Sequence, residues 1–289
     1  MEKRPKRSKG ELEVQEYLES IGEKVVPTAY GIAPGFEVDL YLPEHNLGIE
    51  YNGLYWHNEN RKGSKYHLEK LEAAERSGKR LIQIFEDEWL SKREIVKRRL
   101  AYITGHLPKM VGARECEIRD PEHEHVRDLL NTHHLQGSCA HQVAKGAYFG
   151  DTLVAVMTFS KTRVFFGGEA VDNEWELVRF AAVGSIPGAA SRILKAFRKE
   201  YPNDSIISYA DRRWSDGGLY RSLGFTEVRR SQPNYWYVMG GKRMHRYNFA
   251  KHKLVEQGFD PAMTEEGIML ERGFLRIWDC GTLVYRLDP

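Results

Sequence analysis

The feature that most constrains the fold is a pair of short strand-like segments joined by one tight turn. Residues 36–42 alternate between apolar and polar side chains, which is the pattern of a strand with one buried face. Residues 43–46, Pro-Glu-His-Asn, predict a turn. Residues 47–51 then return as a second strand. If the two strands pair as a hairpin, Asp39 and Glu50 converge at one end of it.

The pattern around this strand pair predicts a small mixed sheet flanked by helices. The further elements expected here are helices at 10–21, 65–77 and 90–103 and a buried strand at 80–85. The acidic run 86–88 is interpreted as an exposed strand end. We therefore expect a first domain at residues 1–107 and a second at 108–289, both of the α/β (α+β) class.

The second half predicts another α/β arrangement. Strands are expected near 115–119, 142–149, 152–159, 175–183, 205–210, 235–239, 275–278 and 283–287, and helices at 121–130, 189–200, 219–223 and 264–271. The turn at Gly150-Asp151 is typical of a hairpin. The tail after Gly258 is expected to pack on this second domain.

Composition excludes some classes of protein. No apolar run approaches the roughly 20 residues that a membrane helix needs, so no membrane partner is expected. The N-terminus leads into a charged helix rather than an apolar signal core. Three distant cysteines argue against a disulfide framework and favour a reducing compartment, so we expect a cytoplasmic location.

The net charge of +2 conceals basic stretches at 1–9, 92–99 and 229–253. The last of these mixes its cations with aromatic side chains, a combination that suits a polyanion with bases to stack on. We expect a nucleic acid as the partner. The candidate DNA-binding residues are Arg229, Arg230, Arg243, Arg246, Lys251 and Lys253. A solvated face is the alternative for any one stretch.

The hairpin end carries the candidate chemistry. Asp39 and Glu50 would repel each other unless a divalent cation lay between them, which predicts a metal site for Mg²⁺ or Mn²⁺. Such an ion activates a bound water and neutralises charge on a phosphate. His57 is suited to accept the proton of the attacking water, and Asn52 to position that water or a phosphate oxygen.

Residues 8–89 resemble the PD-(D/E)xK nuclease superfamily, and within it the very-short-patch-repair (Vsr) endonucleases and their homing-endonuclease relatives. The resemblance is carried by Glu11 in Ser-Lys-Gly-Glu, by Asp39, and by His57 in Leu-Tyr-Trp-His. It implies a restriction-endonuclease-like sheet, a metal on Asp39 and catalysis by His57. There are two departures from the family pattern. Asn52 replaces the usual lysine, and His67 and Lys70 stand where an Arg-Asp pair is common, either replacing those groups or facing solvent.

The second half resembles the acetyltransferase-like (GNAT) fold, and within it is similar to the phage Mom type of DNA-modifying protein. The resemblance rests on the stretches 175–180, 188–192, 207–211 and 219–225. It implies that the loop 184–188 and the following helix N-terminus would hold the pyrophosphate of an acyl-CoA. The loop lacks the usual basic residue and spaced glycines. A domain reused to read DNA is the simpler interpretation.

These observations favour a metal-dependent DNA endonuclease, of a phage-type homing, site-specific or nicking kind. The alternatives are a Mom-like DNA-modifying acyltransferase with an accessory nuclease domain, a Vsr-like mismatch repair nickase and a non-catalytic DNA-binding protein. On the favoured hypothesis, residues after about Lys109 bind DNA and are not needed for the chemistry. The sequence does not fix the oligomeric state, for which a monomer is the simpler expectation.

Overall fold

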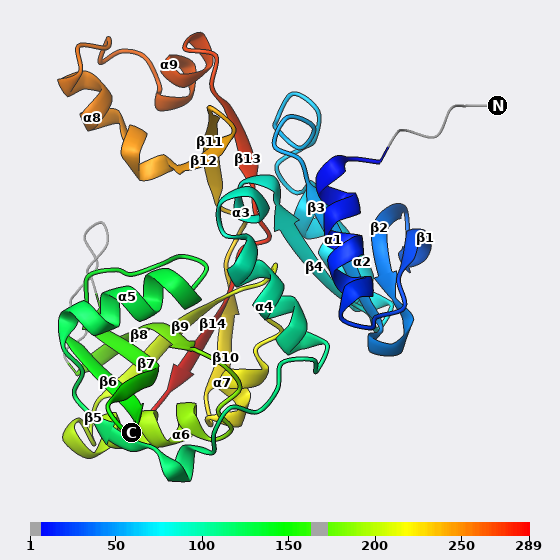
Figure 1. Cartoon of the computed structure of the whole chain (residues 1–289). Helices are drawn as coiled ribbons and strands as arrows, with labels where there is room; N and C mark the ends of the chain where they lie inside the picture. The colour runs from blue at the N-terminus through cyan, green and yellow to red at the C-terminus, as the bar shows by residue number, and fades with distance from the viewer. Residues whose placement is uncertain (1–6, 163–172) are drawn as a thin grey trace. The chain divides into compact units, whose positions relative to one another are not determined.

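The computed structural model describes residues 7–162 and 173–289, so most of the basic N-terminal stretch 1–9 lies outside the described residues. The chain divides into two units, each made of separate stretches of sequence (Figure 1). The first unit holds the residues up to Arg93 together with 211–214 and 231–282. The second holds 94–210, 215–230 and 283–289. The division differs from the expected one at residue 107, because residues 94–107 belong to the second unit and two later stretches return to the first.

The first unit contains a four-stranded sheet of order β1-β2-β3-β4, in which β3 and β4 are parallel and the other pairs antiparallel. Its elements are α1 (Lys9–Ser20), β1 (Val26–Ala33), β2 (Phe36–Leu42), β3 (Leu47–Asn52), α2 (Tyr66–Arg76), β4 (Arg80–Phe85) and α3 (Glu86–Ser91). The expected helices, the strand pair and the buried strand are present. Strand β1 was not expected: it is an edge strand that contains Pro27 and Gly31 and is half exposed, so no alternation marks it.

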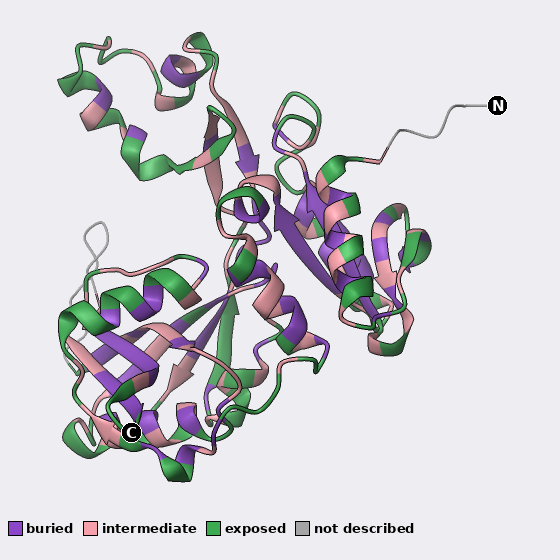
Figure 2. Ribbon diagram, viewed as in Figure 1, coloured by how far each residue is buried: buried purple, intermediate pink, exposed green. Residues whose placement is uncertain are grey.

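The expected hairpin forms through β2 and β3, joined by the short 3-10 turn η1 (Pro43–His45). Asn46 closes the turn in the left-handed region at φ 48°, which asparagine tolerates better than most residues. Along β2, Val38, Leu40 and Leu42 are fully buried while the residues between them are not. The predicted alternation is therefore confirmed. Figure 2 shows β3 and β4 mostly in the colour of buried residues.

The acidic run 86–88 is not an exposed strand end, and that interpretation was wrong. It forms the first turn of α3, and Glu88 is buried. Arg213 donates to both oxygens of Glu88 at 3.0 and 3.1 Å, and Arg243 donates to Oε1 at 2.7 Å. Burial opposes the charged form of Glu88, but the two guanidinium groups prevail and lower its pKa to about 2. The paired arginines explain why a carboxylate is tolerated inside.

A second, three-stranded sheet of order β12-β11-β13 also belongs to the first unit. Its elements are β11 (Tyr235–Met239), β12 (Lys242–His245), η3 (Arg246–Phe249), α8 (Lys251–Glu256), α9 (Glu265–Glu271) and β13 (Leu275–Trp278). Their apolar side chains, including Phe249, Leu254 and Met269, form a small core of their own. The expected packing of residues after Gly258 on the second domain was therefore wrong for all but the last strand.

The second unit is built on a seven-stranded sheet of order β10-β14-β9-β8-β7-β6-β5, with β8 and β9 parallel. Its elements are α4 (Arg93–Ile103), η2 (Ala113–Glu115), β5 (Glu117–Arg119), α5 (His123–His133), β6 (Val143–Phe149), β7 (Thr152–Lys161), β8 (Glu174–Ala182), α6 (Ala189–Glu200), β9 (Ser205–Asp211), α7 (Gly218–Ser222), β10 (Thr226–Arg230) and β14 (Thr282–Leu287). Strands β10 and β14 pair as an antiparallel hairpin, so residues 231–282 are an insertion into its turn.

The mixed α/β class expected from the sequence is confirmed. The core of the second unit lies between α6 and the sheet and includes Phe159, Phe197 and Ile206. Among the residues that the structure describes, no helix is long and apolar enough to cross a membrane.

Candidate functional site

Asp39 and Glu50 meet where the β2–β3 ladder ends. The last backbone pair is Leu40 with Ile49. Beyond it, the two strands are joined by hydrogen bonds from backbone amides to side-chain carboxylates. The Asp39 amide donates to Glu50 Oε1 at 3.0 Å, and the Tyr51 amide donates to Asp39 Oδ2 at 2.8 Å. The convergence expected from the hairpin is thus present, and the backbone itself fixes both carboxylates.

The negative charges of these two carboxylates are not balanced by an equal number of nearby cations. Burial, and then the charge of Glu50, raise the pKa of Asp39 well above its usual range. Burial also raises the pKa of Glu50, although Lys70 opposes this from 2.6 Å away. Burial disfavours the charged form of Lys70, but attraction to Glu50 prevails and raises the pKa of the lysine. One buried cation therefore serves two carboxylates, and Asp39 is the less compensated.

Lys70 and His67 both point into the first unit rather than to solvent: their exposed fractions are 3% and 2%. They lie one turn apart on α2, and α2 packs against β1 and β4. From this helix Lys70 supplies a buried cation to Glu50. Of the two possibilities for these positions, exposure to solvent is excluded.

Glu11 lies on α1, whose N-terminus is capped by the Ser8 side chain. It is buried and forms an ion pair with Arg7. Gly10 lets α1 approach β3: a Cβ there would lie 2.0 Å from the ring of Tyr51. The negative charge of Glu11 contributes to raising the pKa of Asp39, so the glutamate belongs to the same electrostatic cluster.

The donor set fits Mg²⁺ or Mn²⁺ with few protein ligands. Among the described residues no group of three or more His, Cys, Asp or Glu side chains is arranged to hold a metal. Mg²⁺ is commonly bound by only one or two carboxylates, with waters and substrate phosphates completing its shell. Asp39, the less compensated of the two carboxylates, is suited to be such a ligand. Glu50 is the second carboxylate, and its Oε1 is already engaged by Lys70 and the Asp39 amide.

His57 and His67 form a hydrogen-bonded pair, with 2.9 Å between Nδ1 of His57 and Nε2 of His67. Nδ1 of His67 lies 2.7 Å from the carbonyl oxygen of Trp278. A carbonyl only accepts, so His67 carries its proton on Nδ1 and its Nε2 is an acceptor. His57 must then donate from Nδ1, which leaves Nε2 of His57 free of a proton. That nitrogen is the candidate base.

Both imidazoles are held neutral. Burial, and then the positive charge of Lys70, lower the pKa of His57 to about 3. Burial and the neighbouring His57 lower the pKa of His67 well below its usual range. Since Lys70 contacts Glu50 and its charge also acts on His57, the lysine connects the carboxylates with the histidine pair.

Asn52 is held by a buried amide network. Its Nδ2 donates to Oε1 of Gln83 at 3.2 Å, and Gln83 donates to the carbonyl of His67 and to Sγ of Cys280. Oδ1 of Asn52 is buried with no hydrogen-bond partner. A lone acceptor takes a hydrogen bond from water but not from a phosphate oxygen. Of the two roles expected for Asn52, the structure favours water positioning.

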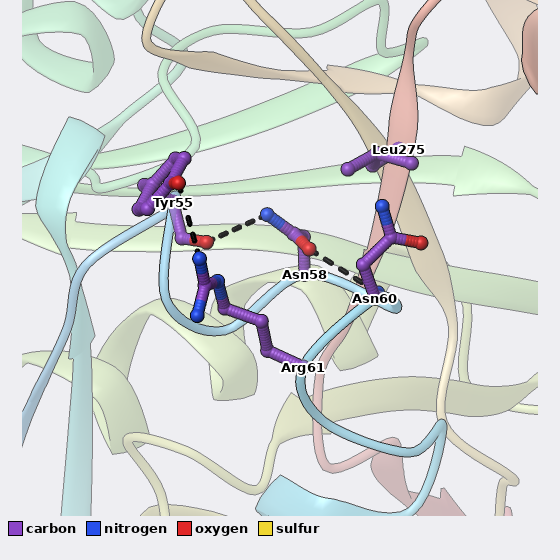
Figure 3. A pocket seen from close by; sticks show the side chains of 5 residues that line it. All are labelled: Tyr55, Asn58, Asn60, Arg61 and Leu275. Carbon is purple, nitrogen blue, oxygen red and sulfur yellow. Dashed lines mark hydrogen bonds between the residues drawn. The ribbon is translucent and has the colours of Figure 1, made fainter.

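The loop that carries His57 also exposes two aromatic rings, Tyr55 and Trp56, at 63% and 60%. The Arg61 guanidinium lies 4.8 and 4.3 Å from their ring centroids. Beside them is a pocket of about 350 Å³, lined by Tyr55, Asn58, Asn60, Arg61 and Leu275 (Figure 3). None of the expected catalytic residues lines it. Exposed rings with a stacked cation are a surface on which bases can stack.

The candidate DNA-binding residues are distributed over both units. Arg229 and Arg230 are exposed on β10, where Arg230 is paired with Glu227. Arg246 and Lys251 are exposed, and Lys253 lies 3.9 Å from the centroid of the Tyr247 ring. Arg243 differs from them, because its side chain is 9% exposed and paired with Asp87 and Glu88. It is a structural residue of the first unit.

The loop 184–188 is bound by another part of the second unit. Met110 donates its amide to the carbonyl of Ser185, and Ala113 to that of Pro187. Arg192, at the start of α6, donates to the carbonyls of Ala113 and Cys116. Its guanidinium is thus engaged with backbone rather than directed at the place expected for a pyrophosphate.

Sequence reasoning missed four contributors to the site: Glu59, Gln83, Arg276 and the Trp278 carbonyl. Glu59, in the loop between β3 and α2, accepts hydrogen bonds from Arg276 of β13. The partners are far apart in sequence, and no local pattern marks them. A glutamine in a buried strand, Gln83, was the one available signal.

No protein-family model matches the sequence, and no curated protein matches it. Similar solved structures include the catalytic domain of the homing endonuclease I-Bth0305I, 25% identical, covering 35% of this chain and 100% of that one, with a TM-score of 0.30. They include a Bacillus subtilis acetyltransferase in complex with CoA (18% identity, 61% and 98% coverage, TM-score 0.32) and aminoglycoside 6'-acetyltransferase type Ii (15%, 60% and 96%, 0.34). The structural neighbours thus include an endonuclease domain and acetyltransferases.

The neutral histidines predict an acid-sensitive fold. An unfolded histidine titrates near pH 6.5, whereas folded His57 does so near pH 3, so between these values the unfolded chain binds the extra proton. The free energy of unfolding should therefore fall as the pH drops below 6.5. In urea titrations at pH 7.5 and 5.0, we expect His57→Gln to lose less stability than the parent. His125→Gln, at an exposed position, is the control; equal losses in parent and His57→Gln would contradict the expectation.

Proposed function

We propose that this protein is a DNA endonuclease that hydrolyses phosphodiester bonds with the help of Mg²⁺ or Mn²⁺. The observation that carries the proposal is the chain of hydrogen bonds from His57 through His67 to the Trp278 carbonyl, which implies an unprotonated Nε2 on His57. Beside it, Lys70 pairs with the buried Glu50 and its charge acts on His57. A base, a cation and an undercompensated carboxylate are what hydrolysis of a phosphate diester requires. A homing, site-specific or nicking activity on double-stranded DNA is the corresponding biological role.

Each residue has a stated part in the reaction. His57 accepts a proton from the attacking water at Nε2. Its Nδ1 proton stays in place and remains donated to Nε2 of His67. Asn52 accepts a hydrogen bond from that water through Oδ1. Lys70 holds Glu50 and places a positive charge near the reacting phosphate. When bound by Asp39, a divalent cation would lower the pKa of a water and neutralise charge on the scissile phosphate.

A plasmid assay tests the proposal. Supercoiled plasmid incubated with the full chain and Mg²⁺ or Mn²⁺ should be converted to nicked or linear DNA, and excess EDTA should prevent it. Sequencing the ends shows whether the cut is specific. Intact plasmid under all metal conditions would refute nuclease activity, and saturable binding of acetyl-CoA by that inactive protein would favour the acyltransferase alternative.

DNA affinity is proposed to depend on the exposed cations of the inserted segment. Each cation that pairs with a phosphate contributes roughly 0.9 to the slope of log affinity against log salt. Replacing Arg246 and Lys251 by alanine should therefore weaken binding and reduce that slope by about 2. Lys195→Ala/Lys199→Ala removes two exposed charges from α6 and should leave the slope unchanged. Titrations at several salt concentrations that give equal slopes for both double variants would contradict the assignment.

Arg243 is left out of this test on purpose. Its substitution would leave Glu88 with one guanidinium fewer in a buried position, so any loss of binding would be mixed with unfolding. Arg229, Arg230 and Lys253 are proposed as further phosphate contacts.

A further inference from the structure

Strand β13 lies along the loop that follows His57, although more than two hundred residues separate them in sequence. Glu59 donates its amide to the carbonyl of Arg276 at 2.9 Å. In return, Oε1 of Glu59 accepts from the Arg276 amide at 2.7 Å, and Oε2 accepts from Nε at 2.8 Å. Two residues further along β13, the Trp278 carbonyl accepts the Nδ1 proton of His67. One strand thus contacts both the loop and the histidine pair.

The inserted segment is anchored at other points of the first unit as well. Cys280 accepts from Gln83 of β4, and Arg243 of β12 pairs with Asp87 and Glu88 of α3. Ile277 packs with Leu54 and Phe85 in a common core cluster. These contacts are buried, so β13 is a fixed part of the first unit.

We propose that residues 231–282 complete the catalytic centre, in that the Trp278 carbonyl and the Glu59–Arg276 pair hold the proton arrangement and position of His57. The inference rests on the proposed nuclease function. Trp278 and Arg276 are positioning residues, since they act through His67 and through the loop.

The chemical reason is the tautomer. Without an acceptor at Nδ1, His67 is free to carry its proton on Nε2, where it would face Nδ1 of His57. His57 would then move its own proton to Nε2, and the nitrogen that accepts from water would be lost. With Trp278 in place, His57 takes up the water proton at Nε2 while both Nδ1 protons stay where they are. The proton count is balanced, and no second transfer is needed.

The test compares Arg276→Ala with Glu266→Gln in the full chain. Glu266 is the exposed second partner of Arg276, so its substitution leaves the Glu59 pair intact. Three quantities are measured: the tautomers of His57 and His67 by ¹⁵N NMR without metal or DNA, kcat and KM on plasmid, and thermal stability. We expect Arg276→Ala to give mixed His57 tautomers and a kcat lower by at least about 10-fold, with KM unchanged; the loss should not exceed the ~10²–10⁴ that a general base contributes. Glu266→Gln should behave as the parent.

Unchanged tautomers and kcat in Arg276→Ala would overturn the inference. If that variant does not fold, Glu59→Gln weakens the same pair with little change of shape and is judged by the same readouts. A parent protein that has the stated tautomers but cuts no DNA would refute the nuclease function while leaving the positioning by β13 intact. A parent with the opposite tautomers would refute the positioning whether or not it cuts.

Discussion

Asp39→Asn should abolish most cleavage while leaving DNA binding and folding intact. Asparagine keeps the shape of the side chain and an oxygen for the Tyr51 amide, but it removes the charge that would hold a divalent cation. Lewis-acid stabilisation by a metal is worth several kcal/mol, and about 1.4 kcal/mol is a factor of ten, so we expect a loss of at least about 100-fold. The measurement is the initial rate of plasmid cleavage at saturating Mg²⁺.

The stability of this variant separates a catalytic role from a structural one. Burial and the neighbouring Glu50 already disfavour the charged form of Asp39, so a neutral side chain relieves repulsion in the fold. The melting temperature of Asp39→Asn should equal or exceed that of the parent in metal-free buffer. Glu37→Gln, on the same strand at an exposed position, should change neither rate nor stability. Cleavage by Asp39→Asn at the parental rate would show that the metal ligand lies elsewhere.

The local parts of the fold follow from the sequence because they depend on short-range patterns. Alternation along β2, a four-residue turn and a buried return strand are enough to bring Asp39 opposite Glu50. Helix α2 ends at Arg76, just before Ser77 and Gly78, and its two inward residues, His67 and Lys70, were singled out by position alone. What the pattern left open was the direction in which these two side chains point.

The parts that could not be predicted depend on pairings between distant segments. Arg243 and Arg246 are three residues apart and equally basic, yet one is buried against Glu88 and the other exposed. A run of basic residues in the sequence does not show which of them pair with acidic residues elsewhere in the fold. Both arginines were therefore predicted to bind DNA. The return of residues 231–282 to the first unit likewise depends on contacts between segments that are far apart in sequence. Trp278 contributes a backbone carbonyl, a group that every residue possesses, and no side-chain pattern identifies it.

These long-range contacts change what a truncated protein should do. The expectation that residues after about Lys109 are dispensable for the chemistry assumes that the histidine pair is complete without them. In the structure the Nδ1 proton of His67 is accepted by Trp278, and Glu88 is neutralised by Arg213 and Arg243. A fragment of residues 1–107 would lack all of these partners and would leave Glu88 as an uncompensated buried charge. The boundary of the proposed nuclease is therefore set by contacts rather than by sequence order.

His57→Gln should lower kcat by about 10²–10⁴, the usual contribution of a general base, with little change in KM. Glutamine retains a polar side chain of similar reach but cannot take up a proton near neutral pH. Because the pKa of His57 lies near 3, the parent enzyme should show no loss of kcat from protonation of this residue between pH 8 and 5.5. A histidine with an ordinary pKa would instead lose activity as the pH fell through 6.5. The loss would occur on the acid side because only the unprotonated form of His57 can accept the proton of the attacking water.

Added imidazole distinguishes a missing base from a damaged site. His57→Gly leaves room for a free imidazole, which should restore part of the rate in proportion to its unprotonated concentration. His125→Gln is the matched control and should retain the parental kcat and pH profile. A loss of activity in His57→Gln that only follows a fall in melting temperature, with no rescue of His57→Gly, would mean that His57 supports the packing around Tyr66 and His67 rather than accepting a proton.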